Sequence, residues 1–382
     1  MIHNCIPCID GNEKKYLNEA LDTNSIAIGE FIKKFENHVA SYTNSSYAIA
    51  VSSGTAALHL ALLANNISKN DEVIIPDLTF AATGFAVRYC EAWPLFVDCN
   101  SDIGILDLKK LRYYLKENCY KKDGKLFNKK SGRIIRAILP VHLYGHPVDM
   151  DELITIIDDY KLILIQDAAE ALGSKYKGKY LGSFSHTSIL SFNGNKLITS
   201  GSGGMVLTDN KKINEKVRYL ANQSKENEVD FIHGDVGYNY RMPNVNAAIG
   251  LAQMEKIEKF IKKKRYIMAA YEKSFESNKN ISMIVEKEWA ESNYWMPIMQ
   301  IDITKSKKNI HEIISQLHTM GVEARPVWKP LSQQPAFEKC QKMDNKNSLK
   351  FFNSSICLPS SVSITDKEIE EVCNSLRDVL HF

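Results

Sequence analysis

YAIAVSSGTAALHLALL, residues 47–63, is the stretch of sequence that decides the fold. Residues 47–51 are suited to a buried strand, and residues 56–63 form an apolar run that is suited to a helix. Between them lies the turn Ser52-Ser53-Gly54-Thr55, where glycine permits a tight bend and the hydroxyl side chains can cap the helix. A buried strand followed at once by a helix is the repeating unit of α/β proteins.

The same alternation continues along the chain. We expect helices from about residue 80 and at 106–117, and strands at 72–75, 95–98, 136–141, 162–166 and 188–192. This alternation predicts a mainly parallel sheet that is covered by helices on both faces. Residues 119–132 are expected to form only a polar, lysine-rich loop.

The pattern changes after about residue 247. One long helix is expected over 247–271, and weaker strand and helix signals follow at 295–301, 310–320 and 366–380. The chain has 382 residues, whereas single cores stop growing at roughly 250–300 residues. We therefore expect a large domain over residues 1–250 and a smaller α+β domain over residues 251–382.

Composition excludes several classes of protein. The chain has 48 Lys and Arg against 45 Asp and Glu, and a net charge of +3 does not indicate the strongly basic surface that binds nucleic acid. A hydrophobic content of 44% excludes the disordered class. No apolar run approaches the ~20 residues of a membrane helix, and the N-terminal segment does not resemble a signal peptide.

The eight cysteines point to no metal site. Only Cys5 and Cys8 have the CxxC spacing, and no second pair completes a zinc site. Scattered reduced thiols are typical of a cytoplasmic protein, which is the location that we expect.

Polar residues just after the strands are candidates for chemistry, since ligands of such sheets bind outside the carboxyl ends of the strands. The first is the turn at 52–55, where the free N–H groups of a helix N-terminus suit a phosphate, although many such turns only cap a helix. The second is Asp167, which directly follows a buried strand. Its carboxylate could cap the next helix, or it could hold a cationic ring nitrogen.

The third candidate is Lys196, in SILSFNGNKLITSGSGGM (188–205). Desolvation in such a tight, mostly uncharged setting makes a lysine amine nucleophilic, as Schiff-base chemistry requires. The alternative is a surface lysine in a loop. The small residues Gly194, Ser200, Gly201, Gly203 and Gly204 indicate close approach by something bulky. The segment is neither a Walker loop nor a dinucleotide fingerprint, which disfavours a dinucleotide-dependent oxidoreductase.

The fourth candidate is GYNYR, residues 237–241. Two tyrosines, an asparagine and an arginine suit a polar binding loop and an interface corner equally well. A phosphate anchor, an acid for a ring nitrogen and an activated lysine together describe a site for pyridoxal phosphate (PLP).

At these residues the chain resembles the DegT/StrS nucleotide-sugar aminotransferases of PLP fold type I. The resemblance is colinear from about residue 10 to the C-terminus. The matching segments are SSGTAALHLALL (52–63), PDLTFAATGFAV (76–87), PVHLYGHPVDMDEL (140–153), QDAAEALGSKYKGKYLGSF (166–184), SFNGNKLITSGSGGM (191–205), GYNYRMPNVNAAIGLAQME (237–255) and GVEARPVWKPL (321–331).

The resemblance implies a role for each matching residue. Lys196 would form the Schiff base and move the proton, and Asp167 would pair with the pyridinium nitrogen. Gly54, Thr55 and Ser191 would bind the phosphate, and Phe80 would stack on the ring. Asn239 would reach the phosphate in the neighbouring subunit, which implies a homodimer with shared active sites.

Two positions depart from the family pattern. Many members have Gln or His at the position of Glu170, and a carboxylate there would repel the phenolic oxygen of the cofactor unless it were protonated or turned away. Many relatives have His at the position of Ser332, so Ser332 is expected to alter the substrate pocket. Arg241, Arg325 and Trp328 are candidates for binding the donor carboxylate, the sugar or the diphosphate, although surface or interface ion pairs explain the arginines equally well.

The implied activity is transfer of an amino group from glutamate to a nucleotide-linked keto-6-deoxy sugar, for surface glycan or glycoprotein biosynthesis. The motifs SFNGNK, ARPVWKP and ICLPS resemble those of enzymes that aminate a UDP-4-keto-6-deoxy-N-acetylhexosamine. The alternatives are a GDP- or dTDP-linked 4-keto or 3-keto sugar, or a non-catalytic regulator with the same fold. A sugar dehydratase of this fold would have His in place of Lys196.

Overall fold

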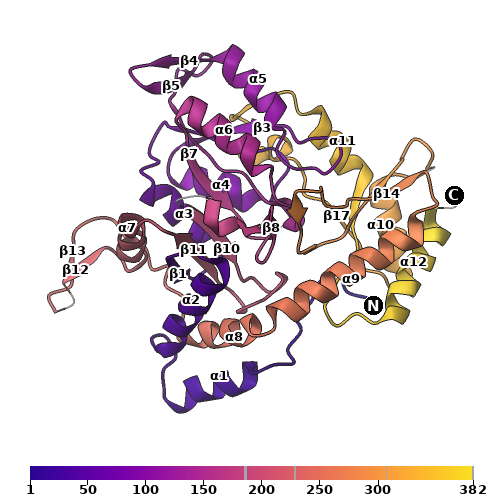
Figure 1. Cartoon of the computed structure of the whole chain (residues 1–382), viewed down its shortest axis with the longest axis horizontal. Helices are drawn as coiled ribbons and strands as arrows, with labels where there is room; N and C mark the ends of the chain where they lie inside the picture. Colours follow the sequence, from indigo (N-terminus) through magenta and orange to yellow (C-terminus); the bar gives the residue numbers. More distant parts are fainter. Residues whose placement is uncertain (185–186, 228, 307, 381–382) are drawn as a thin grey trace.

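In the computed structural model, which describes residues 1–184, 187–227, 229–306 and 308–380, a mixed sheet forms the centre of the molecule (Figure 1). Eight strands of the described residues lie in the order β1-β11-β10-β7-β6-β2-β3-β18. Neighbours from β10 to β18 are parallel, and β11 is antiparallel to both β1 and β10. The strands are β1 (Tyr47–Val51), β2 (Glu72–Pro76), β3 (Trp93–Val97), β6 (Ile135–Ile138), β7 (Ile163–Asp167), β10 (Thr187–Ser191), β11 (Gly204–Thr208) and β18 (Gln341–Lys342).

Helices cover both faces of this sheet because successive side chains of each strand point to opposite faces. Ile49 and Val51 of β1 pack in one core with helices α3, α4 and α7, while Ala48 and Ala50 pack in the other with α2, α5, α6 and α8. The predicted α/β class and the three-layer arrangement are confirmed. The helices are α1 (Glu13–Asp22), α2 (Glu30–Thr43), α3 (Gly54–Ala64), α4 (Ala81–Tyr89), α5 (Leu108–Asn118), α6 (Met150–Tyr160), α7 (Lys211–Ala221), α8 (Asn244–Met254), α9 (Ile257–Phe275), α10 (Ile310–Thr319), α11 (Lys346–Ser354) and α12 (Asp366–Leu380).

The C-terminal part has a core of its own, as expected for a smaller α+β unit. Its sheet has the order β14-β16-β19-β17, and α10, α12 and the end of α9 pack on it. In Figure 1 the long helix α9 runs from beside α8 into this part. The division at residue 250 stays a prediction. The strands are β14 (Ile281–Met283), β16 (Ile298–Ile301), β17 (Arg325–Pro326) and β19 (Ser355–Cys357).

Two segments cross between the parts. Near the N-terminus, Ile2 forms a parallel bridge with Val322, and the backbone of Asn4 accepts a hydrogen bond from the Ser360 amide. In the other direction, β18 adds to the edge of the central sheet beside β3. The two parts of the chain are therefore interlocked by main-chain contacts.

Two local predictions were wrong. Residues 119–128 form a hairpin, β4 (Cys119–Lys122) and β5 (Lys125–Asn128), because Asp123 and Gly124 both adopt positive φ and make the tight turn that such a pair favours. The single helix expected over 247–271 is two helices, α8 and α9. They part at Glu255 and Lys256, whose side chains bind Tyr16 and Asp10 of the N-terminal region.

The remaining strands form small two- and three-stranded sheets at the surface. They are β8 (Lys175–Tyr176), β9 (Lys179–Tyr180), β12 (Lys225–Asn227), β13 (Ile232–His233) and β15 (Ala290–Glu291). The β12–β13 hairpin projects away from the body beyond α7 (Figure 1).

Candidate active site

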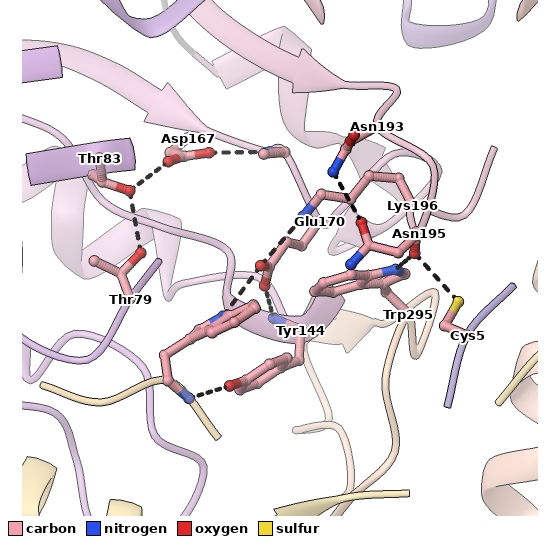
Figure 2. Close-up of polar contacts among 12 residues, drawn as sticks. Cys5, Thr79, Thr83, Tyr144, Asp167, Glu170, Asn193, Asn195, Lys196 and Trp295 are labelled. Atoms are coloured by element: carbon pink, nitrogen blue, oxygen red, sulfur yellow. Dashed lines mark hydrogen bonds and ion pairs between the residues drawn. The ribbon is translucent and has the colours of Figure 1, made fainter. Parts of the chain in front are cut away.

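A cavity of about 270 Å³ opens at the carboxyl ends of β7 and β10. Eight of the residues predicted for the site line it: Gly54, Thr55, Phe80, Asp167, Glu170, Ser191, Lys196 and Trp328. They come from separate strands, turns and the C-terminal part, and Figure 2 shows Asp167 and Glu170 with the Lys196 side chain.

Asp167 is the last residue of β7, and the sheet fixes its position. Its N–H donates to the Pro140 carbonyl at 2.9 Å, and its own carbonyl accepts from the His142 N–H at 3.0 Å. In the carboxylate, Oδ2 accepts from the Thr83 hydroxyl at 2.8 Å and Oδ1 from the Ala169 N–H at 3.1 Å (Figure 2). The carboxylate is therefore held rigidly in the cavity wall.

The electrostatics of Asp167 favour a cationic ligand. Burial raises the pKa of its carboxyl from 3.8 to about 6, against the opposing effect of the Thr83 and Ala169 hydrogen bonds. A buried carboxylate without a full counter-charge is costly, and a cationic ring nitrogen beside it would remove that cost.

The turn before α3 forms an anion site against β10. Ser53 caps the helix by accepting the Ala56 N–H at 3.0 Å. The next two residues, Gly54 and Thr55, line the cavity, and the first amides of a helix have no partner within it. A Cβ on Gly54 would lie 2.9 Å from the Cβ of Ser191, so only glycine lets the turn approach that side chain.

Lys196 lies in the loop between β10 and β11. The loop is closed by the Phe192 N–H, which donates to the Gly203 carbonyl at 2.8 Å, and by the Ser202 hydroxyl, which donates to the Ser52 carbonyl at 2.9 Å. The Lys196 side chain is 13% exposed, and its Nζ lies 3.4 Å from Oε1 of Glu170. It is thus an enclosed amine and not a surface lysine.

Glu170 is turned toward protein donors. Its Oε2 accepts from the Tyr144 N–H at 2.7 Å, and its Oε1 accepts from the Trp328 indole N–H at 3.3 Å as well as from Lys196. Tyr144 has a left-handed backbone, with φ of 53°, at the residue whose N–H binds the carboxylate. Glu170 therefore links the lysine to the C-terminal part of the chain.

Aromatic rings form the side of the cavity opposite the sheet. Phe80, directly before α4, is half-exposed, and its ring centroid lies 5.0 Å from that of Trp328. Tyr144 stacks between Trp328 and Trp295, and its hydroxyl accepts from the Trp328 backbone N–H at 2.8 Å. The two tryptophans come from the C-terminal part of the chain and cover the cavity.

Three predicted residues do not line this cavity. Asn239 and Arg241 are exposed and are held by backbone bridges to Asn222 and Val51. Arg325, also exposed, binds Glu323 through Nε at 3.0 Å.

Ser332 was expected to alter the substrate pocket, and it does not line the cavity. Its hydroxyl donates to the buried carboxylate of Asp77 at 2.9 Å, and its N–H donates to the same group at 2.8 Å. The serine therefore fastens the segment after Trp328 to the end of β2.

The structure adds residues that the sequence analysis did not assign. Thr83 lies one helical turn beyond Phe80, within a segment that carries the family resemblance, so the spacing could have indicated it. Trp295 has no such signal, because it lies about 100 positions from Lys196 in a region of weak strand pattern. Further polar lining residues that had no predicted role are Thr79, Asn193, Asn195 and Ser202.

The donor set fits PLP. A buried acid with a raised pKa, an enclosed lysine amine, a helix N-terminus and a half-exposed aromatic ring lie around one cavity. Among the described residues, no group of three or more metal-ligating side chains gathers.

Comparison with known proteins places the chain in one family. The family model for DegT/DnrJ/EryC1/StrS aminotransferases matches residues 7–377, and the chain belongs to this family. It is a PLP-dependent sugar aminotransferase.

Among its relatives, GDP-perosamine synthase of Escherichia coli O157:H7 is 38% identical over 97% of this chain and 96% of that protein. UDP-4-amino-4,6-dideoxy-N-acetyl-beta-L-altrosamine transaminase of Campylobacter jejuni is 31% identical, with the same coverage. PseC of Helicobacter pylori, an aminotransferase involved in the biosynthesis of pseudoaminic acid, has a TM-score of 0.88 at 22% identity, over 100% of this chain and 99% of that one. That likeness supports the fold assignment.

Proposed function

We propose that the protein transfers the amino group of glutamate to the 4-keto carbon of a nucleotide-linked 4-keto-6-deoxy sugar, with PLP held on Lys196. The observation that carries this proposal is the placement of Lys196 and Asp167 in one cavity with the phosphate turn and Phe80. The amino sugar nucleotide produced would serve polysaccharide or glycoprotein biosynthesis.

Each residue has a defined task in this proposal. Asp167 keeps the ring nitrogen protonated, and Gly54, Thr55 and Ser191 bind the phosphate. Phe80 supports the face of the ring. When bound, PLP supplies an aldehyde carbon for imine formation and a ring that accepts an electron pair. The Lys196 amine takes a proton from the donor carbon and returns it at the other end of the reacting system.

Three further residues, Trp328, Arg241 and Arg325, are proposed to bind the substrates. Trp328 lines the cavity beside Phe80, which supports a role in holding the sugar. Arg241 and Arg325 are proposed to bind the donor carboxylate or the diphosphate once the assembly and the substrate are in place. Both are exposed in the single chain, and Arg325 would exchange its ion pair with Glu323 for the anion of the substrate.

We also propose that the working enzyme is a homodimer with shared sites. The projecting β12–β13 hairpin and the segment after it expose Val229 (84%), Phe231 (65%), Ile232 (51%) and Val236 (77%). An apolar group of this kind suits a surface that is covered by another chain. Asn239 follows a few residues later, is exposed and does not line the cavity of its own chain, which supports its assignment to the site of the neighbouring subunit.

Mixing two inactive variants tests this arrangement. Lys196→Ala and Asn239→Ala should each lose activity, whereas a hybrid dimer has one intact site. After unfolding, mixing in equal amounts and refolding, about a quarter of the wild-type activity should return. Mixing Lys196→Ala with Asp167→Ala is the matched control, since Asp167 lies in the same chain as Lys196. If the first mixture behaves like the second, Asn239 acts within its own subunit or has no role in the site.

The nucleotide has two candidates, each with its own support. A GDP-linked sugar is favoured by the 38% identity to an enzyme named for GDP-perosamine. A UDP-linked N-acetylhexosamine is favoured by the sequence motifs at residues 321–331 and 356–360, which resemble those of enzymes acting on such sugars. It is also favoured by the 31% identity to a UDP-sugar transaminase. The first is our primary proposal, because the greater identity extends over nearly the whole chain.

A substrate panel tests the function. Glutamate-dependent amination should be measured with GDP-, UDP- and dTDP-linked 4-keto-6-deoxy sugars, and with 3-keto isomers. We expect turnover with a 4-keto sugar and preference for GDP. Turnover only with a 3-keto sugar would contradict the proposed position of amination, and no turnover with any sugar would favour the non-catalytic regulator.

None of the helices in the described part of the chain is long and apolar enough to span a membrane. The eight cysteines, all within that part, are unpaired. Free thiols suit a reducing compartment, which supports our proposal that the enzyme acts in the cytoplasm.

A further inference from the structure

Trp295 lies directly against the amine of Lys196. The distance from Nζ to the centroid of the ring is 3.9 Å, and Figure 2 shows the indole below the end of the lysine side chain. Trp295 is fully buried and the Lys196 side chain is 13% exposed, so the contact is largely shielded from water. A cation over the face of an indole is stabilised by the ring quadrupole, and more strongly where water is excluded.

The indole is fixed at its edge and at its backbone. Its Nε1–H donates to the Asn195 carbonyl at 2.7 Å, one residue before Lys196. Its backbone N–H donates to the Asn293 side chain at 2.8 Å, and its carbonyl accepts from the Lys264 amine at 2.9 Å. A rotation of the ring away from the lysine would break the Nε1–H bond to Asn195, and the two backbone bonds hold the main chain from which the ring projects.

Lys264 is an unusual anchor, because it is a fully buried lysine in α9. Its amine also donates to the Ser360 hydroxyl at 2.9 Å and contacts Sγ of Cys5 at 3.5 Å. Burial lowers its pKa. Keeping such a group inside the protein is costly, and what it fixes is the position of Trp295.

Two carboxylates also lie near Lys196 in the cavity. Oε1 of Glu170 lies 3.4 Å from Nζ, and Asp167 lines the same cavity. Behind Glu170 lie Tyr144 and Cys357, and burial raises the pKa of both, so they add no charge. The Lys196 amine thus contacts both a carboxylate and an aromatic face, two groups that attract a positive charge.

We propose that Trp295 and Glu170 form a receptor for the ammonium group of Lys196, which holds the group while the lysine is free of the cofactor. This inference rests on the proposed role of Lys196 as the reacting amine. In that role the amine gains a proton from the substrate carbon, and the receptor stabilises the charged product without a new rearrangement. Trp295, which no sequence pattern indicated, contributes the aromatic part of this stabilisation.

The test uses enzyme loaded with pyridoxamine phosphate, in which Lys196 is free. Acetylation of Lys196 by acetic anhydride is followed by peptide mass mapping as a function of pH, since only the neutral amine reacts. Trp295→Leu removes the aromatic face, and Trp295→Phe keeps a weaker one. Trp93→Leu is the matched control, because Trp93 makes contacts of the same kind with Arg88 and Arg133 outside the site.

We expect the midpoint of the pH dependence to fall by about one pH unit in Trp295→Leu and by less in Trp295→Phe. Trp93→Leu should leave the midpoint unchanged. An unchanged midpoint in folded Trp295→Leu would overturn the proposal, and Trp295→Phe decides the question if the leucine variant does not fold.

A separate borohydride experiment on the wild-type enzyme keeps the two hypotheses apart. If PLP is not fixed to Lys196, the proposed function fails for a reason that does not involve Trp295. If PLP is fixed there and the midpoint does not move, only the receptor is wrong.

Discussion

The two walls of the cavity differ in how they are built. One wall is the carboxyl edge of the central sheet, where Asp167 and Ser191 end strands, Lys196 follows one and Gly54 opens a helix. The opposite wall is Trp295 and Trp328, which come from the C-terminal part and are linked through Tyr144 and Glu170. The first wall carries the groups that react, and the second encloses them and, in our proposal, sets the charge of the lysine.

The largest effect is expected at Lys196, on the sheet wall. Lys196→Ala removes the amine that forms the imine and moves the proton, so activity should fall by on the order of 10⁴-fold or more. The fold should persist, since the side chain makes one ion pair and one ring contact. Steady-state kinetics and circular dichroism check both statements. Lys179→Ala, at an exposed lysine, is the control, and full turnover by Lys196→Ala would remove this residue from the mechanism.

The next largest effect is expected at Asp167. Asp167→Asn keeps the shape of the side chain but removes the charge that holds the ring nitrogen protonated, so kcat should fall by about 10²–10³-fold. The visible spectrum of the bound cofactor should change as well, because it reports the protonation of the ring. Wild-type kinetics in Asp167→Asn would mean that the buried carboxylate only caps the segment after β7.

The same substitution has an effect on stability that depends on pH. The pKa of Asp167 is raised to about 6, so between pH 4 and 6 the folded, cofactor-free protein keeps a proton that the unfolded chain releases. The contribution of Asp167 to the free energy of unfolding is therefore most favourable below pH 4, and it falls as the pH rises through 6. The free energy of unfolding of cofactor-free Asp167→Asn, relative to that of the wild type, should rise by about 2–3 kcal/mol from pH 4 to pH 8. Urea unfolding at both pH values measures the gain, and an equal difference at both would refute it.

The smallest effect is expected at Ser332, which fastens the C-terminal wall from outside the cavity. Its hydroxyl binds Asp77 and accepts from Asn345 at 2.6 Å, so Ser332→Ala should lower the free energy of unfolding by about 1–2 kcal/mol. The activity at saturating substrate should stay within about twofold of wild type. Ser41→Ala, at an exposed serine, is the control. A large loss of kcat with unchanged stability would place Ser332 in the substrate pocket after all.

The sheet wall could be predicted from sequence because its signals are local. Residues 47–51 were predicted as a strand with the bounds that the structure gives, and Asp167 ends the strand expected just before it. Buried parallel strands are apolar throughout, and the polar residue after each one stands out. The strand β11 was missed because it begins within the glycine-rich segment 201–204.

The C-terminal wall could not be predicted in the same way. The position of Trp295 depends on the packing of α9 and on a buried lysine about 30 residues away, and neither leaves a pattern around the tryptophan. The same holds for Glu170: its charge predicts repulsion of the cofactor, but no local pattern indicates that the N–H of Tyr144 holds the carboxylate. Contacts between distant segments decide such positions, and a single sequence does not display them.

The most direct test of the account is to find where the cofactor is attached. The purified protein should be yellow, and borohydride reduction followed by peptide mapping should give one PLP-modified peptide, with the modification on Lys196. A colourless protein that does not respond to added PLP, or a modification at another lysine, would contradict the central claim that this cavity is the PLP site.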